Sequence, residues 1–125
     1  FNTPPVFPIY ATMLTLEWLK DNGGIPAIEK INNQKAELVY SEIDRNPLFT
    51  GFVTNKEDRS KMNATFSLHD ESLAERFNAM VKEAGINGLN GHRSVGGYRA
   101  SMYNALSVES VQTLVDTMKE LERTA

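Results

Sequence analysis

The chain has 125 residues, of which 41% are hydrophobic and 23% are charged, with no cysteine and a formal net charge of -3. This composition indicates one globular domain and excludes a disordered tail, a disulfide framework and a thiolate metal site. The acidic balance argues against general nucleic-acid binding, which depends on many Lys and Arg contacts to phosphate. Because Pro, Thr, Asn and Gly interrupt the uncharged stretches, the sequence predicts no membrane-spanning helix. We expect a cytoplasmic protein.

The first helix is expected over residues 6–20, after Pro4-Pro5 and before the stop signal of Gly23-Gly24. Its apolar side chains do not keep to one stripe, which is typical of a helix that is covered on most sides. A domain of this size is too small to cover the helix on most sides. We therefore expect a part of the protein outside this chain to pack against the helix. The start at Phe1, without methionine or a signal-peptide pattern, also suggests a piece of a longer protein.

The middle of the chain predicts helices and short strands. Residues 26–42 have the apolar spacing of an amphipathic helix, and residues 48–54 follow a proline turn as a candidate strand. Apolar and polar residues alternate along 62–68, which is the period of a half-buried strand. A third helix is expected over 71–84, with Gly85 as its stop.

Two more short strands are expected at 86–89 and 98–103, and Ser107 can cap a last helix. This order predicts an α+β fold, a two-layer sandwich with helices packed on one face of a small, mainly antiparallel sheet. The chain is then divided into a connecting helix, residues 1–24, and a sheet-and-helix body, residues 25–125.

Charge is distributed unevenly along the chain. Between Ala84 and Val108 there is no Asp or Glu, yet this stretch carries His92, Arg93, Arg99 and five glycines. Guanidinium groups bind carboxylates and phosphates through paired hydrogen bonds, and glycines let backbone amides approach the same anion. The stretch therefore predicts a site for a small anion.

The alternation along a strand predicts the direction of Arg99. In a strand over 98–103 its side chain points away from Ala100, to a face where it can converge with His92 and Arg93 across a glycine turn. The alternative is a solvated loop with three scattered cations, and the spacing alone leaves both interpretations open.

Other polar residues have simpler interpretations. The glycines at 85, 88 and 91 match neither a dinucleotide fingerprint nor a phosphate loop, so they indicate turns. Beside His69, Asp70 is expected to cap a helix rather than to help bind a metal. Glu42 and Asp44 are interpreted as solvated helix-end charges. None of the seven lysines is expected to have the desolvated setting of a reactive amine.

Asn2 and Thr3 precede the first helix, and the pattern favours a role in capping or starting it. Their donors can equally serve a phosphate, so this alternative stays open.

Three segments of the chain form a distinctive set: Asn2-Thr3-Pro4-Pro5 with the aromatic-rich helix after it, Arg59-Ser60-Lys61-Met62-Asn63, and Gly91-His92-Arg93-Ser94-Val95-Gly96-Gly97-Tyr98-Arg99-Ala100-Ser101 followed by Asn104-Ala105-Leu106. Together they resemble the phosphoserine aminotransferase family. The resemblance runs in order over the whole chain, and the last segment is the most specific. The chain as a whole corresponds, by this resemblance, to the C-terminal small domain of these pyridoxal-phosphate enzymes. The enzymes have the aspartate aminotransferase fold type.

The resemblance implies a homodimeric enzyme that transfers the amino group of glutamate to 3-phosphohydroxypyruvate in serine biosynthesis, with pyridoxal 5'-phosphate as its cofactor. Some bacterial members use a related substrate in pyridoxine biosynthesis. The resemblance further implies that Arg99 holds the substrate α-carboxylate and that His92 and Arg93 help to bind the substrate phosphate. Asn2 and Thr3 match positions that reach the cofactor phosphate of the second subunit.

By the same resemblance, the large cofactor-binding domain and its Schiff-base lysine would lie upstream of Phe1, so the 125 residues alone should be inactive. The departures are modest, since Val6 and Ala64 stand where the family has Thr and Val, and Tyr98 occupies a variable position. No catalytic residue and no metal ligand is expected within the chain.

Two other hypotheses belong to different classes of protein. One is a free-standing regulatory domain of ferredoxin-like type that binds a small anion or an amino acid. The other is an RNA-binding sheet, which needs exposed strand aromatics and a basic face, and the acidic balance argues against it. An upstream domain with a Schiff-base lysine would favour the aminotransferase.

Overall fold

The computed structural model describes residues 2–125, which divide into two compact units between Ile31 and Asn32. The first unit contains helix α1, Val6–Asp21, which confirms the first expected helix. Its apolar side chains are exposed in this chain. No helix in the described residues is long and apolar enough to cross a membrane.

Helix α2, Gly24–Arg45, begins at the second residue of the Gly23-Gly24 pair, and the boundary between the two units falls within it. Both glycines have a positive φ, 90° and 71°. This backbone conformation is favourable only for glycine, which explains why the helical run is interrupted here.

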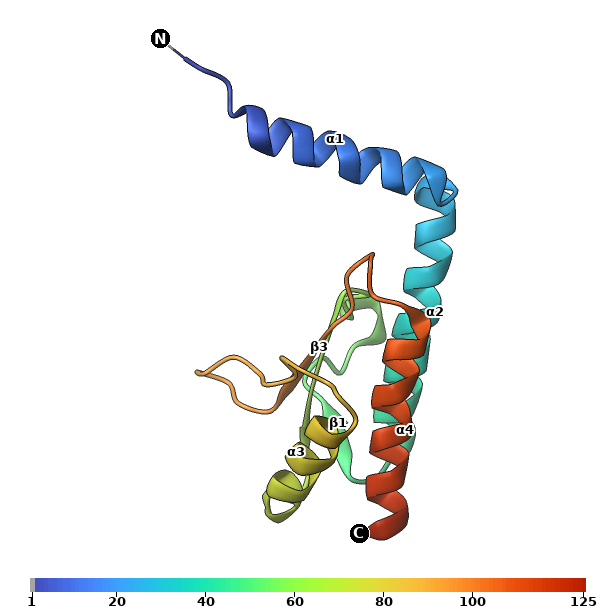
Figure 1. The fold of residues 1–125 in the computed structure, drawn as a ribbon. Helices are drawn as coiled ribbons and strands as arrows, with labels where there is room; N and C mark the ends of the chain where they lie inside the picture. The colour runs from blue at the N-terminus through green and yellow to red at the C-terminus, as the bar shows by residue number, and fades with distance from the viewer. Residues whose placement is uncertain (1) are drawn as a thin grey trace. The chain divides into compact units, whose positions relative to one another are not determined.

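The second unit is built on a three-stranded antiparallel sheet with the strand order β1-β2-β3 (Figure 1). The strands are β1, Phe49–Gly51, β2, Asn63–Leu68, and β3, Tyr98–Ser101, and a short 3-10 turn η1, Lys56–Asp58, precedes β2. Alternate residues of β2 are buried, as its sequence period predicts.

The two helices after β2 and β3 are preceded by the capping residues expected from the sequence, although Asp70 caps the short 3-10 turn before the first of these helices and not that helix itself. After the 3-10 turn η2, Glu71–Leu73, the chain forms α3, Ala74–Glu83, and it ends in α4, Val108–Thr124. The Asp70 side chain accepts a hydrogen bond from the Ser72 amide at 2.9 Å. Ser107 Oγ accepts one from the Ser110 amide at 3.2 Å. Both contacts satisfy amides that a helix start leaves unpaired.

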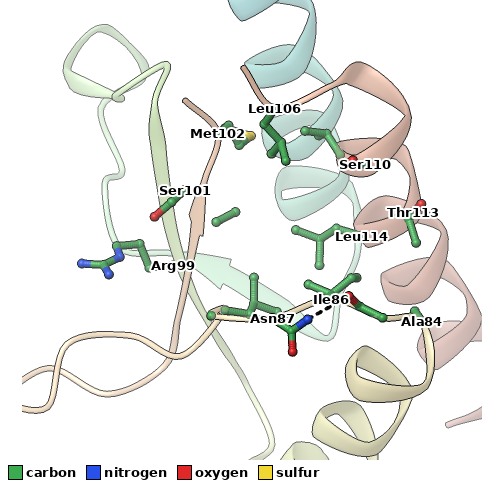
Figure 2. A pocket seen from close by; sticks show the side chains of 15 residues that line it. Ala84, Ile86, Asn87, Arg99, Ser101, Met102, Leu106, Ser110, Thr113 and Leu114 are labelled. Atoms are coloured by element: carbon green, nitrogen blue, oxygen red, sulfur yellow. Dashed lines mark hydrogen bonds between the residues drawn. The ribbon is translucent and has the colours of Figure 1, made fainter. Parts of the chain in front are cut away.

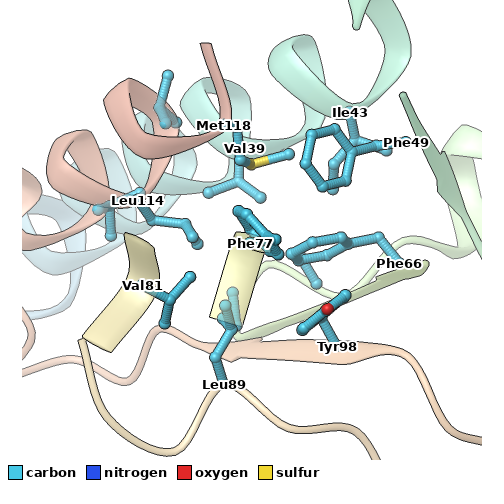
Figure 3. Packing of buried hydrophobic residues seen from close by; sticks show 14 of the residues in the cluster. Val39, Ile43, Phe49, Phe66, Phe77, Val81, Leu89, Tyr98, Leu114 and Met118 are labelled. Carbon is cyan, nitrogen blue, oxygen red and sulfur yellow. The ribbon is translucent and has the colours of Figure 1, made fainter. Parts of the chain in front are cut away.

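The core lies between one face of the sheet and the helices, which confirms the predicted α+β fold (Figure 3). Four aromatic rings from the strands and α3 meet at its centre. The Phe77 ring lies 5.2 Å from that of Phe49 and 5.0 Å from that of Tyr98, both edge-on. The second half of α2 and the length of α4 close the layer with aliphatic side chains, among them Val39, Leu114 and Met118.

The prediction of a strand at 86–89 is wrong. Residues 84–89 form a loop in which Gly85 and Gly88 have φ of 75° and 74°, and these positive angles break an extended run. Pairing between the end of this loop and β3 is limited to two contacts. The Arg99 amide donates to Leu89 O at 2.7 Å, and Asn90 and Tyr98 form one isolated bridge.

Candidate anion-binding site

Arg99 projects from the open face of the sheet. Its neighbours in β3, Tyr98 and Ala100, are buried on the helix side, whereas Arg99 is exposed. Thr65 of β2 is its cross-strand partner. The predicted direction of Arg99 is therefore confirmed, and pairing with β2 holds its backbone in place.

The segment before Arg99 is a tight loop over residues 91–97. The Gly91 amide donates to Gly97 O at 2.9 Å, and His92 O accepts from the Val95 and Gly96 amides at 3.0 and 2.8 Å. A Cβ at Gly91 would lie only 2.0 Å from Gly96 O. Because glycine has no side chain, the backbones at the two ends of the loop can contact each other directly.

His92 and Arg99 line one hollow of about 230 Å³ between this loop and the sheet. No Asp or Glu is among its lining residues, which are Phe52, Thr65, Gly91, His92, Val95, Gly96, Tyr98 and Arg99. His92 Nδ1 lies 2.7 Å from Ser94 Oγ, which orients the imidazole from within the loop. The walls of the hollow are mostly apolar.

Arg93 is exposed on the same loop and is not among the residues that line the hollow. The structure thus brings together two of the three predicted site residues, His92 and Arg99.

Asn2 and Thr3 lie in the first unit, in exposed chain before α1. The capping interpretation is wrong, because Pro5 occupies the N-cap position and no side chain caps this helix. Pro5 has no backbone N–H and a restricted φ, so it fits the start of the helix without a capping side chain.

A second hollow, of about 280 Å³, lies between the 84–89 loop, β3 and α4 (Figure 2). Its interior is lined by aliphatic side chains such as Leu106 and Leu114, and Asn87 Nδ2 donates to Gly85 O at 3.2 Å. Arg99 borders this hollow too, but its guanidinium points away from the other labelled side chains. The head of Arg99 is thus available on the open face of the sheet.

Lys35 is a polar residue whose burial the sequence interpretation missed. Its side chain is fully buried, and Nζ donates to the carbonyl oxygens of Met102, Tyr103 and Leu106 at 3.2, 2.8 and 3.0 Å. Burial lowers its pKa. The expectation that no lysine is desolvated is therefore wrong, although the three carbonyls occupy the amine.

Glu42 is also buried, which corrects its interpretation as a solvated charge. Its carboxylate accepts from Arg45 and, at 2.8 Å, from Asn46 Nδ2. Arg45 in turn pairs with Glu122 at 2.7 Å, so this cluster joins α2 to α4.

The Arg59 segment, one of the three that carry the resemblance, is structural here. Arg59 donates to both carboxylate oxygens of Asp44, at 2.8 and 2.7 Å, and to Val53 O at 3.1 Å. Its guanidinium also stacks 4.7 Å from the centre of the Tyr40 ring. The bidentate contact lowers the pKa of Asp44. These contacts fasten the β1–β2 connection to α2.

The family model described as aminotransferase class V matches residues 1–114. The chain belongs to the class-V aminotransferase family.

Its relatives within that family are phosphoserine aminotransferases. Those of Flavobacterium psychrophilum and Flavobacterium johnsoniae are 70% and 63% identical to this chain over 122 residues, which is 98% of this chain and 34% of each relative. The chain thus spans about a third of the length of the curated relatives that it matches.

Solved structures agree with the sequence relatives. Phosphoserine aminotransferase from Bacillus circulans subsp. alkalophilus superposes with a TM-score of 0.90 at 42% identity, over 98% of this chain and 34% of that one. The PLP-bound enzyme from Trichomonas vaginalis gives 0.83 at 38% identity, over 95% and 34%. The resemblance found in the sequence and the expected fold type are confirmed.

Proposed function

We propose that this chain is the C-terminal part of a pyridoxal-phosphate-dependent phosphoserine aminotransferase, which transfers the amino group between glutamate and 3-phosphohydroxypyruvate. The observation that carries the proposal is the hollow shared by His92 and Arg99, free of carboxylates, on a chain 70% identical to a phosphoserine aminotransferase. The family match favours this hypothesis over a free-standing regulatory domain.

Arg99 binds the substrate α-carboxylate in this proposal. Its backbone is fixed by strand pairing on one side and by Leu89 on the other, and its guanidinium is free to form a bidentate contact. His92 binds the substrate phosphate from the loop side of the hollow, and Arg93, exposed on the same loop, assists it. A substrate with anionic groups at both ends would then be oriented by contacts at each end.

The side chains of Arg99, His92 and Arg93 can donate hydrogen bonds to anions, but they do not provide the amine that attaches the cofactor covalently. Among residues 2–125 no lysine lines the hollow with Arg99, and the amine of Lys35 is engaged by three carbonyls. We therefore assign the attachment to a large domain outside this chain and expect the 125 residues alone to be inactive. When bound, pyridoxal phosphate would supply an electron sink that accepts electrons from the substrate α-carbon.

Asn2 and Thr3 complete the proposal at the other end of the chain. Their exposed amide and hydroxyl donors suit a phosphate group, and they cap no helix here. We propose that they bind the cofactor phosphate across the interface of a homodimer.

The test replaces Arg99 by alanine in the full-length enzyme. Because glutamate and phosphoserine both carry an α-carboxylate, kcat/KM should fall for both substrates, by about 2–5 kcal/mol in transition-state stabilisation. The matched control is Arg76→Ala, which removes an exposed arginine of α3 outside the hollow and should leave both values unchanged. A loss confined to one substrate would contradict the carboxylate role.

A further inference from the structure

We propose that Phe52 is a positioning residue for the loop over residues 91–97, and that it acts on substrate phosphate binding through His92 and Arg93. This inference rests on the proposed function. Phe52 belongs to the β1–β2 connection, 40 positions before His92, and no sequence motif singles it out.

The ring of Phe52 touches the base of the loop. A Cβ at Gly97 would lie 3.0 Å from two carbon atoms of this ring and 2.6 Å from Phe66 O. Gly97 has a φ of 62°, and the position a Cβ would take is already filled by the Phe52 ring and Phe66 O, so the loop backbone lies directly against both the ring and the sheet.

The backbone of Phe52 is held by the sheet, and the residue is 42% exposed. Its amide donates to Thr65 O at 3.0 Å, directly after β1. The ring therefore stands on a backbone that the sheet fixes, and it forms one wall of the hollow together with Thr65 and Val95.

The loop and Arg99 depend on different supports. Arg99 lies within β3, where Thr65 is its cross-strand partner and Leu89 accepts its amide. His92 and Arg93 lie in the body of the loop, where the hydrogen bonds that the structure shows for residues 92–96 are made within the loop. Removal of the Phe52 ring should therefore loosen the two loop cations and leave Arg99 in place.

The experiment compares Phe52→Ala with Phe52→Tyr in the full-length enzyme, with phosphoserine and glutamate as separate substrates. Displacement of binding groups by a fraction of an ångström weakens binding markedly, so Phe52→Ala should raise KM for phosphoserine about tenfold. KM for glutamate should change less than about twofold, since Arg99 is undisturbed. Phe52→Tyr keeps the ring and should restore the phosphoserine KM.

A merely structural role would lower the amount of active enzyme, and hence kcat for both substrates alike, without moving either KM. That result would overturn the inference, as would equal KM increases for the two substrates. Arg93→Ala and His92→Ala, measured in parallel, distinguish failure of the Phe52 inference from failure of the phosphate assignment. If these variants raise the phosphoserine KM and Phe52→Ala does not, the inference alone fails. If they too leave it unchanged, the phosphate assignment fails, and the inference fails with it.

Discussion

Lys35 Nζ lies 2.8 Å from the carbonyl oxygen of Tyr103, across 68 positions of sequence, and it donates to two further carbonyls of the same loop. The three hydrogen bonds can use all three ammonium protons. A single side chain of α2 thus holds the chain between β3 and α4, the segment that follows Arg99.

Replacement of Lys35 by methionine should destabilise the protein by about 3 kcal/mol, because buried carbonyls lose their donor. The free energy of unfolding in urea measures the effect. Lys119→Met removes an exposed lysine of α4 and should change this free energy by less than about 0.5 kcal/mol. Equal effects of the two substitutions would show that the Lys35 contacts contribute nothing specific.

Asn46→Ala should cost about 2–3 kcal/mol of stability. Asn46 Nδ2 donates to Glu42 Oε1 at 2.8 Å and to Met118 O at 3.2 Å, and its Oδ1 accepts from the Leu48 amide at 3.1 Å. All three groups lose a partner at once. Asn78→Ala on the exposed side of α3 is the control, and urea unfolding distinguishes the two variants.

A comparison of two glycine substitutions separates backbone strain from steric overlap. Gly85 and Gly97 have similar φ values, 75° and 62°, but a Cβ at Gly85 meets nothing within 4 Å, whereas one at Gly97 meets Phe66 O at 2.6 Å. Gly85→Ala should cost about 1–2 kcal/mol from the left-handed backbone alone. Gly97→Ala should cost clearly more in the same unfolding assay, and equal costs would contradict the close packing of the loop.

Stability should fall in acid partly through Asp44. Arg59 lowers the pKa of this carboxyl in the folded state. A depressed folded pKa means that the unfolded chain binds the proton first, so the contribution is complete above about pH 4 and is lost as pH falls through the folded value. The difference in unfolding free energy between the wild type and Asp44→Asn should be constant near neutrality and should shrink below about pH 4. A difference that does not change with pH would contradict this linkage.

Local patterns predicted most of the fold, because they depend on residues close in sequence. The alternation along β2 and β3 gave the buried face and the direction of Arg99 correctly, and the caps at Asp70 and Ser107 were identified from single residues. The prediction of a strand at 86–89 was wrong because its apolar residues lie among glycines with positive φ.

The burial of Lys35 and of Glu42 had no signal in the sequence. Lys35 finds its acceptors 67 to 71 positions away, and the Glu42 cluster is completed by Arg45 and Glu122 across 77 positions. Helical spacing shows which side chains share a face, but it does not show which distant loop covers that face. The contact of Phe52 with Gly97 was missed for the same reason.

The most direct test of the phosphate assignment is the substrate discrimination of Arg93→Ala in the full-length enzyme, measured as kcat/KM for phosphoserine divided by kcat/KM for glutamate. Our account predicts that this ratio falls at least tenfold, since only phosphoserine presents a phosphate to the loop. A proportional loss for both substrates, with the ratio unchanged, would contradict it.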